Sequence, residues 1–487
     1  MAHIEIVDQT LRDGQQTFWG FRLRAGMVMP VVDHLDRAGY RAVEYAGGAA
    51  FEVSLRTCRE DPWEAYDLLR SSLKTTPMRS ARRASAMGKF GLTPHSMLDL
   101  YNRTLVKHGA QSFWIYDCLY NMAELERSCR TVAEAGAQVF PAIMFSDSPV
   151  HTDAYFADKV RQYASWGIAS GIFVEDAPGI LTPSRTATLI PALIEAAQGL
   201  PVEFHCHETL GLATQNYLEA IKHGVTILHT CSRPLATGPS LPSVEMLTTN
   251  LEALGHTHDI DRTQLAPIAE QLSRVARSEG FATGNPNEYD ARLYLHQLPG
   301  GMTGTLKAQL ADYGVSESFD AVVHEMAQVR ADLGYPVSAT PFSQLIGIQA
   351  LLNVTSGERY KVVPDEVIMY ACGHYGETPM PIDGNVKDRI LGMPRARELA
   401  AWTPPQPTIE EMRKDYGGPE LSDEELILRY LAPIEDIEAT RAAGPVRRGY
   451  DFSDDTSVPA LVEEILKSSR ARSVKLRLPS MYIRVSR

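Results

Sequence analysis

The chain has 487 residues, 44% of them hydrophobic and 22% charged, which is the balance of an ordinary globular enzyme. Its formal net charge of −13 argues against nucleic-acid binding, and no apolar run is long enough to span a membrane. The six cysteines lack paired spacing and the chain opens without a secretory leader, so we predict a cytoplasmic protein with free thiols.

The first half of the chain alternates short β-branched or aromatic segments with longer segments of helical periodicity, such as Leu98–His108 and Tyr155–Trp166. The eight predicted strands are Ile4–Asp8, Ala42–Ala46, Met78–Arg82, Ser112–Tyr116, Gln138–Phe145, Gly171–Val174, Val202–His205 and Thr226–Thr230. Strict alternation over about 250 residues favours a closed (β/α)8 TIM barrel. An open doubly wound sheet usually carries a glycine-rich nucleotide loop after its first strand, and this chain has none. We therefore predict an α/β protein with a TIM barrel over residues 1–260.

Beyond the barrel the strand signal disappears and helical spacing replaces it, with glycines between the segments. The three predicted helices there are Leu265–Glu279, Ser318–Leu333 and Pro341–Asn353. They define a helical domain over residues 261–400. We expect a linker and helical cap over residues 401–445, and a tail over residues 446–487 with one helix, Val458–Ser468. Residues 473–485 alternate as a strand pair, which either pairs with itself or offers an edge to a partner.

Polar residues that directly follow a barrel strand are candidates for the active site, because barrel active sites lie at the carboxyl ends of the strands. Three such places are the loop Asp8–Gln16, the pair Glu175–Asp176 and the segment His205–Glu208. Histidines at positions i and i+2 of a strand end point to the same side, so His205 and His207 can bind one cation. The ordinary alternative is that they are two polar residues at the end of a strand. Asp13 supplies an anionic oxygen from across the barrel mouth. This set suits Zn²⁺, Mn²⁺ or Co²⁺ and leaves positions open for a substrate oxygen.

Six short motifs follow one another in the same order as in a known family, between residues 3 and 440. They are Thr10–Thr17, Glu44–Gly48, Glu60–Glu64, Pro299–Leu306, Leu333–Gly347 and Leu421–Pro433. Together they resemble the carboxyltransferase subunits and domains of biotin-dependent enzymes: the oxaloacetate decarboxylase alpha subunit, the transcarboxylase carboxyltransferase subunit and the pyruvate carboxylase carboxyltransferase domain. Each motif alone is weak evidence for the family, but six motifs in the same order are specific to it.

The resemblance implies roles for particular residues. The implied metal ligands are Asp13, His205 and His207, and the implied pocket residues are Arg12, Gln16, Arg83 and Phe90. The guanidinium group of an arginine can donate two parallel hydrogen bonds to the carboxylate of a 2-oxo acid. A Lewis-acidic metal would stabilise the enolate of that acid. Thr340 would carry a proton between biotin and the substrate enol. The ordinary alternatives are a salt bridge between Arg12 and Asp13, and a helix N-cap by Thr340 before Pro341.

Four positions depart from the family pattern. Glu175 stands where the family carries a carboxylated lysine that is a fourth ligand. We expect Glu175 to serve catalysis, and three arrangements stay open: direct binding of the metal, binding through water, or none. Phe90 lacks the hydroxyl of a pocket tyrosine, Ala46 replaces a tryptophan, and Tyr120 replaces an asparagine. These changes fit a different acceptor, altered chemistry or reduced activity.

The chain contains no Ala-Met-Lys-Met biotinylation hairpin, so biotin would arrive on a separate carrier protein. The resemblance further implies a biotin carboxylase subunit as partner, a small 2-oxo acid substrate and a homodimer. Three functions stay open. The first is a metal-dependent carboxyltransferase or decarboxylase component, which Thr340 and the helical domain over residues 261–400 favour. The second is a biotin-independent metal-dependent lyase, aldolase or decarboxylase, which Glu175 favours, and the third is a noncatalytic subunit.

Overall fold

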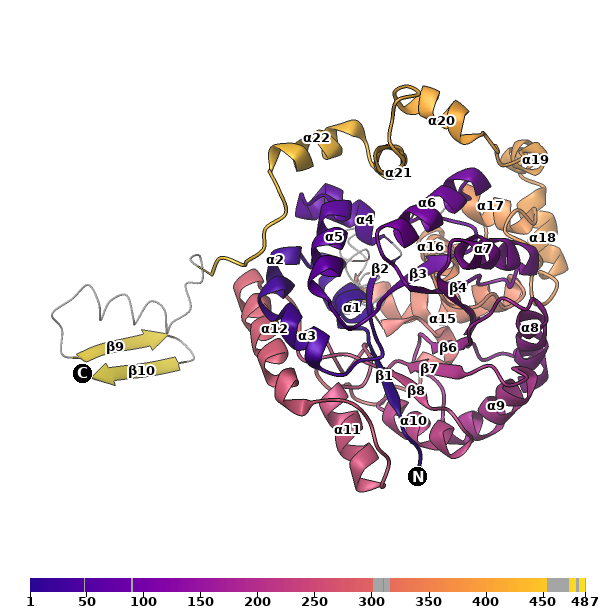
Figure 1. Ribbon diagram of the computed structural model, residues 1–487. Helices are drawn as coiled ribbons and strands as arrows, with labels where there is room; N and C mark the ends of the chain where they lie inside the picture. Colours follow the sequence, from indigo (N-terminus) through magenta and orange to yellow (C-terminus); the bar gives the residue numbers. More distant parts are fainter. Residues whose placement is uncertain are drawn as a thin grey trace.

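The computed structural model describes residues 1–47, 49–88, 91–300, 310, 316–452, 473–478 and 481–486. Within it, eight parallel strands close into one barrel in chain order (Figure 1). The strands are β1 (Glu5–Asp8), β2 (Ala42–Gly47), β3 (Met78–Arg83), β4 (Ser112–Tyr116), β5 (Gln138–Met144), β6 (Ile172–Asp176), β7 (Val202–Cys206) and β8 (Ile227–Thr230). The barrel prediction is confirmed, and each strand end lies within two residues of its expected position.

The register of the barrel brings polar strand ends to one level. Glu175 on β6 is the partner of His205 on β7, and Asp8 on β1 is the partner of Thr230 on β8. A single π-helical turn, η1 (Thr10–Gly14), follows β1 directly and carries Asp13 into the barrel mouth. Short π-helical turns are frequent at functional sites.

Helices surround the barrel (Figure 1), and each of them buries at least one apolar side chain. They are α1 (Gln15–Trp19), α2 (Ala25–Val28), α3 (Val32–Arg37), α4 (Ala50–Val53), α5 (Pro62–Ser72), α6 (His95–Lys107), α7 (Met122–Glu134), α8 (Asp153–Ser165), α9 (Pro183–Ala196), α10 (Ala213–Lys222), α11 (Val244–Ala253) and α12 (Leu265–Glu279). Side-chain oxygens start several of them: Asp61 caps α5, Thr152 caps α8 and Ser243 caps α11. These caps explain why the helices begin sharply after their loops.

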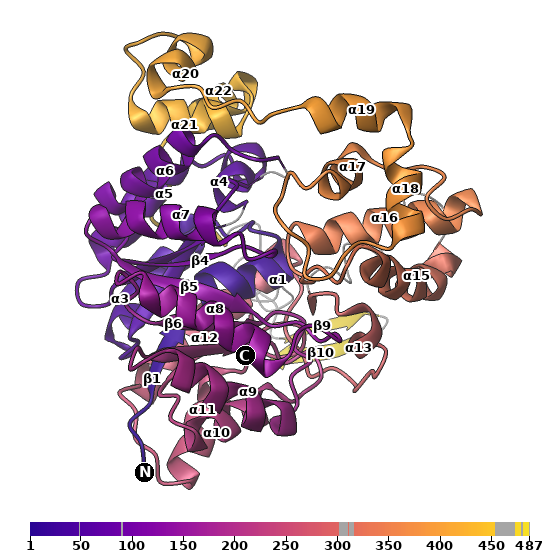
Figure 2. The ribbon, with the colours of Figure 1, turned by 90° about the vertical axis from the view of Figure 1, so that its right-hand side faces the viewer.

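Beyond α12 and up to residue 442, the described secondary structure consists of helices joined by loops. Its helices are α13 (Leu293–His296), α15 (Phe319–Asp332), α16 (Phe342–Ser356), α17 (Asp365–Ala371), α18 (Gly384–Leu391), α19 (Pro394–Ala401), α20 (Ile409–Tyr416), α21 (Asp423–Leu431) and α22 (Ile434–Ala442). Figure 2 shows α15 to α18 gathered at one side of the barrel, while α20 to α22 lie over α6. Trp63 of α5 donates to the carbonyl of Glu424 at 3.3 Å, which fastens α21 to the barrel.

The tail contains the expected strand pair. β9 (Ser473–Leu478) and β10 (Met481–Ser486) pair antiparallel with each other, so the self-pairing alternative is the one observed. The helix predicted at residues 458–468 lies outside the described residues. All six cysteines are free thiols, as predicted. Among the described helices, none is both long and apolar enough to cross a membrane.

Candidate metal centre and substrate cavity

Four buried side chains converge at the carboxyl ends of β1, β6 and β7: Asp13, Glu175, His205 and His207. One ligand atom from each lies within 4.8 Å of all the others. The Nε2 atoms of the two histidines are 3.3 Å apart, and they lie 3.4 Å and 3.5 Å from Asp13 Oδ2. Atoms bound about 2.1 Å from a tetrahedral ion lie about 3.4 Å from one another. The spacing therefore fits one divalent cation.

A hydrogen bond orients the imidazole of His207, and burial sets the charge of His205. His207 Nδ1 donates to the carbonyl of Pro239 at 2.7 Å, which turns Nε2 toward the cluster. Burial lowers the pKa of His205 well below its usual value, so this ring is neutral. Burial opposes a charge on His207 as well, but Asp13 raises its pKa to about 9. A bound cation would displace that proton.

Glu175 completes the set as a second carboxylate. Its Oε1 lies 3.8 Å from His205 Nε2, and its Oε2 is buried without a hydrogen-bond partner among the described residues. Burial raises the pKa of Glu175 to about 7, because little around it favours the charge except Arg12 and His207. Burial also opposes ionisation of Asp13, but Arg12 and the histidines hold its pKa well below the usual range. An unpaired buried carboxylate oxygen is costly, and a cation would remove that cost.

A cavity of about 300 Å³ opens over this cluster. Its walls include these predicted site residues: Arg12, Asp13, Gln16, Arg83, Glu175, His207 and Thr340. His205 is fully buried beneath them. Phe90, the remaining predicted pocket residue, lies outside the described residues, and so does the side chain of Ala46. The cavity volume is at the lower end of the range typical of small-molecule sites.

Arg12 Nη1 forms a salt bridge with Asp13 Oδ2 at 2.9 Å, which was the alternative to a role in the pocket. Arg12 also lines the cavity. The two arrangements coexist, because the guanidinium has five N–H groups. Its Nη2 is buried and is left without a hydrogen bond among the described residues.

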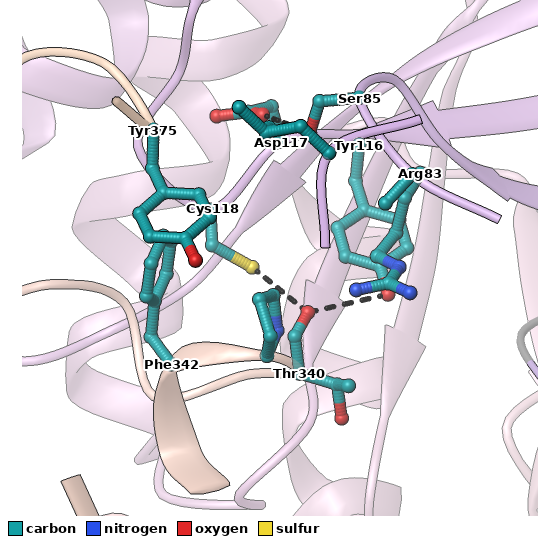
Figure 3. Close-up of a pocket in the computed structure, with 11 residues that line it drawn as sticks. Arg83, Ser85, Tyr116, Asp117, Cys118, Thr340, Phe342 and Tyr375 are labelled. Atoms are coloured by element: carbon teal, nitrogen blue, oxygen red, sulfur yellow. Dashed lines mark hydrogen bonds between the residues drawn. The ribbon is translucent and has the colours of Figure 1, made fainter. Parts of the chain in front are cut away.

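Thr340 lies immediately before α16, between the barrel and the helical part of the chain. The N-cap position of α16 is Pro341, and no side chain caps the helix, so the alternative role of Thr340 as N-cap is wrong. The Thr340 carbonyl accepts from Tyr116 Oη and Cys118 Sγ, each at 3.5 Å (Figure 3). Thr340 borders both the main cavity and a smaller pocket of about 20 Å³ beside Tyr375. That smaller space holds about one water molecule.

Two aromatic residues of the cavity wall were not predicted from the sequence, and a third lies away from the cavity where it was expected. Trp114 and Tyr116 line the cavity from the end of β4. Their i, i+2 spacing at a strand end is the signal that could have identified them. Tyr120, which we expected to change the pocket, is buried behind β5, where its hydroxyl bonds both the N–H and the carbonyl of Met144 at 2.9 Å. It supports the strand and does not line the cavity.

Comparison with known proteins assigns both halves of the chain. The HMGL-like family matches residues 3–272, and the conserved carboxylase domain of the PYC_OADA type matches residues 293–441. A pyruvate carboxylase subunit of Methanocaldococcus jannaschii is 30% identical over 463 residues, which cover 94% of this chain and 81% of that protein. The chain belongs to the carboxyltransferase family of biotin-dependent carboxylases.

Two further members of the carboxyltransferase family are named for other substrates. The 2-oxoglutarate carboxylase large subunit of Hydrogenobacter thermophilus is 32% identical, over 89% of this chain and 67% of its own. The methylmalonyl-CoA carboxyltransferase 5S subunit of Propionibacterium freudenreichii is 27% identical, over 79% of this chain and 75% of its own.

A solved carboxyltransferase domain shares the fold. The carboxyl transferase domain of Rhizobium etli pyruvate carboxylase, solved with oxamate and biotin, superposes with a TM-score of 0.83 at 24% identity. The superposition covers 91% of this chain and 79% of that domain. Against the complete Rhizobium etli enzyme, the chain spans 46% of the length.

Proposed function

We propose that this chain is the carboxyltransferase component of a biotin-dependent carboxylase or decarboxylase that acts on a 2-oxo acid or a similar enolisable acid. The observation that carries the proposal is the meeting of a cation site, two arginines and Thr340 around one cavity. Relatives named for pyruvate and for 2-oxoglutarate support a 2-oxo acid as substrate.

Asp13, His205, His207 and Glu175 would hold the divalent cation, which is Zn²⁺, Mn²⁺ or Co²⁺ by the chemistry of two imidazoles and two carboxylates. When bound there, the cation would supply a Lewis acid beside the enolisable substrate. Of the three arrangements open for Glu175, we propose direct binding. The support is its position 3.8 Å from His205 Nε2 and its unpaired, buried Oε2.

The chain's own side chains would bind the substrate and move a proton. Arg12, Gln16 and Arg83 border the cavity and would hold the substrate carboxylate, for which guanidinium forks are well suited. In the carboxylation direction, the Thr340 hydroxyl would give its proton to the biotin nitrogen that loses CO₂. It would take a proton from the carbon beside the substrate carbonyl, and that carbon would form the new bond to CO₂. The threonine ends the cycle unchanged.

The partners and the location of the protein follow from the same proposal. Biotin would arrive on a separate carrier protein, a biotin carboxylase subunit would recharge it, and the chain would form a homodimer in the cytoplasm. Two relatives that are themselves called subunits support a multi-chain assembly. Copurification with a biotinylated protein, together with the mass of the complex in solution, tests the partners and the dimer.

The test of the activity is decarboxylation of oxaloacetate by the metal-loaded protein, with and without free biotin and after chelation. We expect turnover that biotin stimulates and the chelator removes. Turnover that requires metal but ignores biotin would contradict the proposal in favour of a biotin-independent lyase. An inactive protein that still copurifies with a biotinylated carrier would instead point to the noncatalytic subunit.

Glu175→Gln should weaken metal binding at least about 10-fold, because the amide keeps the size of the side chain but loses its charge. The measurement is metal content after dialysis against a graded metal buffer. Glu208→Gln is the matched control, since Glu208 is a neighbouring buried carboxylate that bonds Thr214 and not the cluster. Equal metal affinity in wild type and Glu175→Gln would exclude direct binding by Glu175.

A further inference from the structure

A fully buried carboxylate, Glu44 on β2, lies behind the cavity and receives three N–H donors. Arg12 Nε donates to its Oε1 at 2.6 Å, and Trp114 Nε1 donates to the same oxygen at 2.9 Å. Gln9 Nε2 donates to its Oε2 at 2.8 Å. Both oxygens are thus occupied, so Glu44 has no direct role toward a ligand in the cavity.

Glu44 and its neighbours fix Arg12 on three sides. Glu44 holds Nε, Asp13 holds Nη1 at 2.9 Å, and the guanidinium carbon lies 5.1 Å above the centre of the Trp114 ring. Trp114 is itself stacked on Phe173 at 4.4 Å with an interplanar angle of 5°. Only Nη2 lacks a partner among the described residues, and Arg12 borders the cavity. Within the described part of the chain, the arrangement leaves one guanidinium nitrogen unpaired in a side chain that forms part of the cavity wall.

Without Glu44, the fork of Arg12 would be free to turn fully onto Asp13, because arginine and carboxylate prefer two parallel hydrogen bonds. Such a pair would withdraw the Asp13 oxygens from the cation and the Arg12 nitrogens from the substrate. Because Arg12 bonds both Glu44 and Asp13, it cannot turn fully onto Asp13, and both groups stay in place.

We propose that Glu44 is a positioning residue that holds the Arg12 guanidinium in the cavity wall, where it would meet the substrate carboxylate. This inference rests on the proposed function, in which Arg12 binds that carboxylate. Glu44 acts only through Arg12, so its removal raises the substrate concentration needed for binding more than it lowers the rate of the bound complex.

The experiment compares Glu44→Gln and Glu44→Asp with a matched control, Asp332→Asn. Asp332 is also a buried carboxylate that accepts from an arginine and an aromatic hydroxyl, but it lies on α15 and bonds Arg359 and Tyr360. The measurements are KM and kcat for oxaloacetate decarboxylation, metal content, and pyruvate binding by calorimetry. We expect Glu44→Gln to raise KM and the pyruvate Kd about 10-fold or more, with kcat lowered less than about 3-fold.

The design separates the possible failures. Pyruvate binding that is equal in wild type and both Glu44 variants overturns the inference, as does an equal loss in Asp332→Asn. If wild type binds pyruvate but does not turn over oxaloacetate, the proposed activity fails, and weaker pyruvate binding by Glu44→Gln still supports the positioning role. Should Glu44→Gln fail to fold, Glu44→Asp decides, because it keeps the charge but falls one methylene short of Arg12; unaltered binding there overturns the inference.

Discussion

Replacement of Thr340 by alanine is expected to lower biotin-dependent carboxyl transfer by about 10²- to 10⁴-fold, the usual contribution of a positioned proton-transfer group. The substitution removes the one hydroxyl that we assign to proton transfer at the border of the cavity, and it leaves the cation cluster intact. Because Thr340 does not cap α16, alanine should cost the helix little stability. The assay is the rate of oxaloacetate decarboxylation with biotin, beside the melting temperature and metal content.

Thr340→Ser is the matched control for this prediction, since serine keeps the hydroxyl and loses only a methyl group. Its rate should stay within about 10-fold of wild type, because a positioned hydroxyl contributes most of the effect. A Thr340→Ala protein that retains full biotin-dependent turnover would show that another group carries the proton.

His207→Ala should release the metal and abolish turnover. His207 faces the cluster with Nε2 and is held there by the Pro239 carbonyl, so alanine removes both a ligand and its anchor. We expect metal content below about a tenth of wild type, and turnover at least about 10³-fold lower, because a Lewis acid contributes several kcal/mol. Elemental analysis of the purified protein measures the first effect and the decarboxylation assay the second.

The control for this second prediction is His151→Ala, which removes a buried histidine that bonds Ser148 and not the cluster. Its metal content should match that of wild type. A His207→Ala protein that keeps its full metal content would place the cation elsewhere in the molecule.

The barrel and the cation cluster were predictable because their signals are local. Each strand is a short apolar run bounded by polar residues, and the histidines stand two apart at a strand end. Glu44 was not predictable in its role, because its partners Arg12 and Trp114 are 32 and 70 residues away and meet it only inside the closed barrel. The alternative role of Thr340 as an N-cap is wrong for a different reason: α16 starts one residue later than the Thr-Pro signal predicts.

The pairing of the first and last barrel strands has a consequence for the order in which the site can form during synthesis. Asp8 and Thr10, which start the turn that carries Asp13, are tied to the last strand and the loop beyond it: β1 pairs with β8, and the N–H of Ser232 donates to Thr10 Oγ1 at 2.7 Å. Thr10 and Ser232 are 222 positions apart in the sequence. At about 5–20 residues per second, the ribosome takes about 10–45 s to make that stretch. During that interval β1 of the nascent chain can pair with β2 but not with β8, and the turn that carries Asp13 is not yet anchored to Ser232. Metal binding at this site would therefore follow closure of the barrel.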